Sequence, residues 1–145
     1  LFRSALDARG YGELVASTTQ LNTPGVPLAE MAQVHALTDV TGFGLAGHTL
    51  ELARASGLEA VVHYGALPLL PEVSRLAAAG FVTGASGRNW AAYGAEVRLD
   101  AALPEVARDL VADPQTSGGL LVSCAPEAVP AVLEVFRAQG FDTRR

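Results

Sequence analysis

The segment that most constrains this chain is HALTDVTGFGLAGH, residues 35–48. The pattern predicts a strand over 34–40 with Asp39 near its end, then a glycine turn over 41–44 and a helix over 45–56. A carboxylate offers the hard oxygen ligands that suit Mg²⁺. The first N–H groups of a helix attract an anion, and the helix dipole adds to that attraction. This order of elements indicates a place where a metal-bound phosphate can be held.

A second segment, DPQTSGGLL over residues 113–121, repeats the combination of an acid, hydroxyls and paired glycines ahead of an apolar strand. Two interpretations are open for it. Pro114 can fix a simple surface turn. Alternatively, the hydroxyls and the glycine N–H groups can form a concave nest that binds an anion.

Composition excludes several classes of protein. Half of the residues are apolar and 17% are charged, which is typical of a globular domain. The apolar runs are too short to span a membrane, and the first residues show no signal-peptide pattern. The net charge is −5 with acids and bases interspersed, which argues against a nucleic-acid groove. The lone Cys124 excludes an internal disulfide and fits a reducing, cytoplasmic compartment. Since all ten cationic residues are arginine, no lysine of this chain can form a Schiff base or bind phosphate.

The remaining pattern predicts helices over 1–20, 28–33, 71–79, 104–112 and 126–138, strands over 58–64, 96–99 and 119–124, and loops over 21–27, 84–93 and 113–119. Strands and helices alternate without a regular parallel repeat. We therefore expect an α+β fold, a small mixed β-sheet with packed helices. We expect residues 1–20 to form an N-terminal helical segment or linker and residues 21–145 to form the α+β domain.

Three motifs in this order resemble one family. They are TDVTGFGLAGH (38–48), GASGRNWAAYG (84–94) and DPQTSGGLL (113–121). The chain resembles the C-terminal domain of the selenophosphate synthetases, or selenide, water dikinases, within the aminoimidazole ribonucleotide synthetase superfamily. The resemblance implies the fold of that domain and a cytoplasmic two-domain enzyme. Such an enzyme makes selenophosphate, AMP and phosphate from selenide, ATP and water.

The family's N-terminal domain carries the reactive cysteine or selenocysteine and most of the nucleotide site. We expect that domain to be missing from this chain, which also lacks an initiator Met, so that the isolated chain is inactive. The resemblance further implies Mg²⁺ between the two domains and a homodimer when full-length. From the charge pattern and the short apolar runs we expect no nucleic-acid or membrane partner. Two alternatives stay open: another member of the superfamily, or a non-catalytic binding or assembly module.

The resemblance makes Asp39 a Mg²⁺ ligand, although a capping or turn aspartate explains the same local pattern. The glycine turn can be a tight turn, a close approach to phosphate, or both. Arg88 can be a solvated arginine or a bidentate phosphate partner. His35 shares a strand face with Asp39 and can orient it, but we expect His35 to be a hydrogen-bonded core histidine and Cys124 to be buried and unreactive. The predicted phosphate and nucleotide contacts are Thr41, Gly42, Gly44, Arg88, Asn89, Thr116, Ser117, Gly118 and Gly119. No catalytic residue is predicted in this chain.

Overall fold

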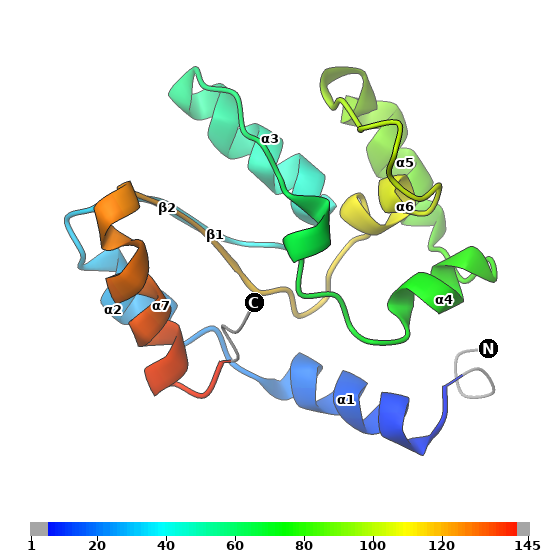
Figure 1. The fold of residues 1–145 in the computed structure, drawn as a ribbon, viewed down its shortest axis with the longest axis horizontal. Helices are drawn as coiled ribbons and strands as arrows, with labels where there is room; N and C mark the ends of the chain where they lie inside the picture. The colour runs from blue at the N-terminus through cyan, green and yellow to red at the C-terminus, as the bar shows by residue number, and fades with distance from the viewer. Residues whose placement is uncertain (1–5, 142–145) are drawn as a thin grey trace. The chain divides into compact units, whose positions relative to one another are not determined.

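Two antiparallel strands, β1 (Val34–Asp39) and β2 (Leu120–Cys124), form the sheet of this protein (Figure 1). The coordinates are a computed structural model that describes residues 6–141. In the register of the pair, Asp39 lies opposite Leu120 and Leu37 opposite Val122. The register shifts by one residue between Val34 and Ala36, so the pairing is irregular at His35. Because the strands are antiparallel, the residues that leave β1 and those that enter β2 lie at the same end of the pair.

The described residues form two compact units. The strand unit contains residues 21–39 and 119–141, and the helical unit contains residues 6–20 and 40–118. In the strand unit, α2 (Gly25–Ala29) and α7 (Val129–Ala138) lie side by side in Figure 1. The turn η4 (Pro126–Ala128) leads into α7.

The core of the strand unit forms where α2 meets the sheet and α7. The side chains of Leu37 and Leu120 lie within 4 Å of the position that a Cβ on Gly25 would occupy. Leu28 is fully buried, and Val132 of α7 is nearly so. The apolar face of α7 and the apolar residues of the strands therefore both contribute side chains to this core.

The helical unit contains α1 (Ala8–Thr19), α3 (Gly44–Ser56), α4 (Val73–Ala78), α5 (Gly84–Tyr93) and α6 (Ala107–Val111), with the short turns η2 (Tyr64–Ala66) and η3 (Gly94–Glu96). The Asp7 carboxylate caps α1 by accepting from the N–H of Gly10. Helix α3 ends at Ser56, and the next residue, Gly57, has a left-handed φ of 64°. Buried side chains of α4, α5 and α6 form the core of this unit, among them Leu76, Tyr93, Ala107 and Val111.

The α+β class is confirmed, with a sheet narrower than the small mixed sheet that we expected. Residues 58–64 and 96–99 were predicted as strands, but neither is paired in a sheet. Instead, an ion pair between Arg98 and Glu59 links the two segments. A strand needs a partner for its main-chain groups, and β propensity alone does not provide one.

The predicted loop over residues 84–93 is wrong: these residues form helix α5. Gly84 and Gly87 indicated a loop, but the Thr83 side chain caps the helix by accepting from the N–H of Ser86. Burial of Ser86 and Tyr93 on one side of α5 outweighs the low helix propensity of the glycines. The predicted division of the chain at residue 20 stays a prediction.

Candidate functional site

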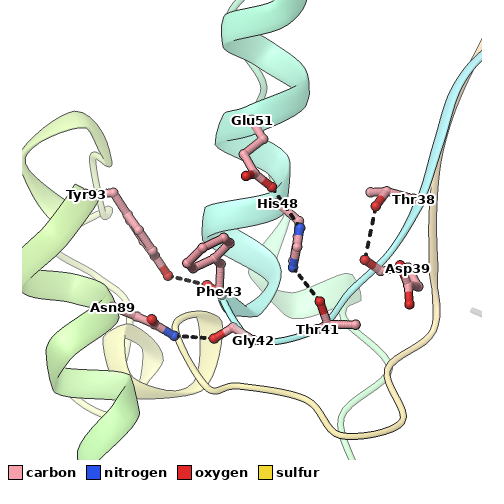
Figure 2. A network of polar contacts seen from close by, with 9 residues as sticks. All are labelled: Thr38, Asp39, Thr41, Gly42, Phe43, His48, Glu51, Asn89 and Tyr93. Carbon is pink, nitrogen blue, oxygen red and sulfur yellow. Dashed lines mark hydrogen bonds and ion pairs between the residues drawn. The ribbon is translucent and has the colours of Figure 1, made fainter.

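Asp39, the predicted metal ligand, is the last residue of β1 and is exposed. Within the strand unit its carboxylate makes no hydrogen bond or ion pair; the Thr38 hydroxyl donates to its main-chain oxygen instead (Figure 2). The carboxylate does not cap a helix. It is therefore available to a ligand, as is Gly119, which is also exposed and precedes β2.

The glycine turn over residues 41–44 is fixed by main-chain contacts in the helical unit. The main-chain oxygen of Thr41 accepts from the N–H of Gly44 and from the N–H of Gln115. Gly44 has a φ of +69°, and a Cβ there would lie 2.7 Å from the carbonyl carbon of Ala112. Only glycine fits this backbone angle and this close approach. The first glycine motif is thus built against the second, whose residues follow Ala112.

Helix α5 joins the same two motifs through one side chain. The Asn89 amide nitrogen donates to the carbonyl oxygens of Gly42, at 2.8 Å, and Ala112, at 3.0 Å. One turn further along α5, the Tyr93 hydroxyl donates to the carbonyl oxygen of Phe43 at 2.6 Å (Figure 2). Burial raises the pKa of the Tyr93 phenol, which keeps it a donor. Three segments far apart in the sequence therefore meet around the turn.

The second motif begins with Asp113, a half-buried carboxylate. It accepts hydrogen bonds from the hydroxyls of Ser86 and Thr83 and from the Gln115 amide. Burial raises the pKa of this carboxyl group, and the three hydrogen bonds act in the opposite direction. Asp113 thus ties its loop to the first turn of α5.

Gly118, near the end of the second motif, lies close to the main chain of Val40. A Cβ at Gly118 would lie 1.8 Å from the carbonyl oxygen of Val40, a distance that no side chain tolerates. Thr116 and Ser117 are exposed, and within the helical unit their hydroxyls make no hydrogen bond. Their polar atoms therefore face solvent, as a ligand-binding loop requires.

Arg88 lies next to Asn89 on α5 but has a different environment. It is exposed and takes part in none of the ion pairs within the described residues. Its guanidinium group is therefore free to bind an external anion. No side chain caps the N-terminus of α3, so the N–H groups of its first turn after Gly44 remain available.

The metal-ligand chemistry of the described residues is limited. No three of their His, Cys, Asp and Glu side chains form a group that could hold a metal ion. One exposed carboxylate suits Mg²⁺, which usually takes one or two carboxylates and completes its shell with phosphate oxygens and water. The donor set thus fits a metal delivered with a nucleotide rather than a closed protein cage.

A cavity of about 860 Å³ lies elsewhere in the helical unit. It is lined by aliphatic residues of α3 and by the extended segments over 58–64 and 96–103. None of the predicted ligand residues borders it. The cavity therefore does not define the candidate site. In residues 6–141, no helix has the length and apolar character needed to cross a bilayer.

The network around His48 was missed by sequence reasoning. His48 is buried and contacts both Thr41 and Glu51. The core histidine was expected at His35 instead, and that prediction is wrong because His35 is exposed. The helical spacing of His48 and Glu51 indicated that this pair could meet. Nothing in the sequence indicated that the imidazole would turn toward Thr41.

Comparison with known proteins shows the family to which this chain belongs. The family model for the C-terminal domain of AIR synthase related proteins matches residues 14–144, and the chain belongs to that family. The chain is 64% identical over 142 residues to the selenide, water dikinase of Burkholderia pseudomallei, which covers 98% of the chain and 40% of that protein. Identity to the proteins of the same name is 56% for Dechloromonas aromatica and 55% for Rhizobium meliloti. The chain spans about 40% of the length of these curated relatives.

Proposed function

We propose that this chain is the C-terminal half of a selenophosphate synthetase. The full-length enzyme would make selenophosphate from selenide, ATP and water and release AMP and phosphate. The observation that carries the proposal is 64% identity to a selenide, water dikinase over 98% of the chain. The contact between its two glycine motifs in the helical unit supports it.

In this proposal the domain binds the phosphate end of Mg²⁺–ATP. Asp39 provides a carboxylate oxygen to Mg²⁺, which neutralises phosphate charge when bound. Thr41, Gly42 and the uncapped start of α3 beyond Gly44 present main-chain N–H groups to phosphate oxygens, and Gly44, whose N–H is donated to Thr41, allows the close turn. Arg88 adds a charged donor.

The second motif contributes the hydroxyls of Thr116 and Ser117 and the N–H groups of Gly118 and Gly119. Asn89 acts indirectly: its amide nitrogen already donates to two main-chain carbonyls, so it holds the two motifs together instead of contacting the nucleotide. These preorganised donors would stabilise the charge that develops during phosphoryl transfer.

The other half of the proposed enzyme, an N-terminal domain, would supply the selenium-reactive residue and most of the nucleotide contacts. We propose a cytoplasmic homodimer that pairs through that domain, with no nucleic-acid or membrane partner. A different member of the superfamily would share the architecture, but the dikinase relatives favour the selenium reaction.

Calorimetric titration tests this assignment against a non-catalytic module. We expect no measurable binding of Mg²⁺–ATP to this chain alone, and binding when the N-terminal domain is supplied in trans. Indifference of the chain to both the nucleotide and the domain would favour the module. Selenide-dependent AMP production by the chain alone would contradict the proposal that the N-terminal domain supplies the selenium-reactive residue.

The Asp39→Asn variant tests the metal ligand in the full-length protein. Because the carboxylate is exposed and makes no hydrogen bond within its unit, the free energy of unfolding should change by less than about 0.5 kcal/mol. The Mg²⁺-dependent affinity for ATP should fall at least about tenfold, equivalent to about 1.4 kcal/mol. Glu127→Gln removes a charge from an exposed side chain of the same unit and is the matched control. Unfolding of the Asn variant with unchanged nucleotide affinity per folded molecule would make Asp39 structural.

A further inference from the structure

Three polar side chains of the helical unit form a continuous network of polar contacts, from Glu51 through His48 to Thr41 (Figure 2). The Glu51 carboxylate lies 2.9 Å from Nδ1 of His48. On the other side of the ring, Nε2 lies 3.1 Å from the Thr41 hydroxyl oxygen. The imidazole thus bridges a carboxylate on α3 and a hydroxyl in the glycine turn.

The imidazole and the Thr41 backbone of this network are held in place, and the half-exposed Glu51 side chain reaches the ring from the same helix. His48 and Glu51 are three residues apart on α3, so they share a face of the helix. His48 is only 8% exposed, and the Phe43 ring packs 5.7 Å from the imidazole, centroid to centroid. The Thr41 main-chain oxygen is held by two N–H groups, as described above. The imidazole and the Thr41 backbone therefore have little freedom to rearrange.

The contacts of the imidazole favour one arrangement of hydrogens in this network. The Glu51 carboxylate can only accept, so it favours the tautomer of His48 with the ring hydrogen at Nδ1. In that tautomer Nε2 carries a lone pair and accepts the hydrogen of the Thr41 hydroxyl. Thr41 is left with oxygen lone pairs and no hydrogen to offer.

We propose that Glu51 and His48 are positioning residues that hold the Thr41 hydroxyl as an oxygen ligand for a divalent cation. This inference rests on the proposed function and refines it, because Thr41 was expected to approach phosphate, whereas a hydroxyl without a free hydrogen is suited to a hard cation. Carboxylates behind a metal-ligating group orient that group and raise its basicity. In the same way, Glu51 orients His48, and His48 orients the Thr41 hydroxyl and raises the basicity of its oxygen.

A change of metal preference tests the ligand role of Thr41 in the full-length protein. Thr41→Cys replaces a hard oxygen with a soft sulfur, which favours Cd²⁺ over Mg²⁺. We expect calorimetric affinity for ATP in Mg²⁺ to fall about tenfold and to be restored in Cd²⁺. Thr41→Ser should retain the preference of the unsubstituted protein, and Thr41→Val should bind weakly with both metals.

The positioning role is tested with Glu51→Gln, measured by Mg²⁺ titration at fixed ATP. The amide can donate to Nδ1 and thereby place the ring proton on Nε2, which turns Thr41 from donor to acceptor toward the ring. The Mg²⁺ concentration for half-maximal ATP binding should rise about tenfold with an unchanged melting temperature. Glu72→Gln is the control, because Glu72 also pairs three residues along its helical segment, with Arg75, but contacts no residue of the turn.

Each outcome decides between the proposals. Mg²⁺-dependent ATP binding in the unsubstituted protein, without a Cd²⁺ preference in Thr41→Cys, would overturn this inference and leave the proposed function intact. Equal effects of Glu51→Gln and Glu72→Gln would also overturn it. Absence of Mg²⁺-dependent ATP binding in the unsubstituted protein would overturn the proposed function and, with it, the inference.

Discussion

Replacement of Asn89 by alanine tests whether the two glycine motifs depend on one side chain. The variant loses the hydrogen bond to Gly42, worth about 1 kcal/mol net. It also loses the bond to the carbonyl of Ala112, a fully buried residue, and leaving that oxygen unpaired costs about 1–3 kcal/mol. Alanine recovers up to about 0.7 kcal/mol of helix propensity. The free energy of unfolding should therefore fall by about 1.5–3 kcal/mol in total.

Urea denaturation of the chain, followed by circular dichroism, measures this loss. Arg88→Ala is the matched control, because Arg88 is the preceding residue of α5, is exposed and makes no ion pair within the described residues. The control should change stability by less than about 0.5 kcal/mol. In the full-length protein the same Arg88 variant should weaken ATP binding. Equal stability of the two variants would refute the assignment of Asn89 as the link between the motifs.

Three further changes test other contacts. Gly118→Ala should destabilise the chain by roughly 2–4 kcal/mol because its Cβ would overlap the Val40 oxygen, whereas Gly119→Ala, with open space around it, should be nearly neutral in the same denaturation assay. Thr49→Val should raise the melting temperature, since the buried Thr49 hydroxyl has no hydrogen-bond partner among the described residues and its removal should gain about 1 kcal/mol; a loss of stability would contradict this. Asp113 has a raised pKa, so just above its ordinary value of 3.8 the folded state binds more protons than the unfolded state, and stability falls as pH rises. Denaturation at a series of pH values should show this fall, at most about 1.4 kcal/mol per pH unit, and Asp113→Asn should abolish it; an unchanged slope in the variant would count against the burial of this carboxyl group.

Local signals in the sequence predicted the elements that depend on local contacts. Strand β1, helix α3 with its left-handed Gly57, and strand β2 were all predicted near their observed bounds. Their alternation, helical period and terminating glycine act within a few residues. Asp39 could be singled out for the same reason, because a carboxylate at a strand end before a glycine turn is a local pattern.

Helix α5 shows where that reasoning failed. Its glycines indicated a loop, but capping by Thr83 and burial of Ser86 and Tyr93 against other elements determine the helix. Conversely, residues 58–64 have the composition of a strand and lack a partner strand among the described residues. Secondary structure in both segments depends on packing that a local window does not contain.

The sequence by itself determined the chemistry available here: one carboxylate after a strand, two glycine motifs, and no lysine. Only the tertiary structure decided how these groups are used. Asn89 reaches Gly42 across 47 residues, and folding of α3 onto the turn brings the His48 ring to Thr41. Hydrogen bonds between distant segments form only once packing has fixed their distance and direction, and so the arrangement of the turn is a property of the folded unit.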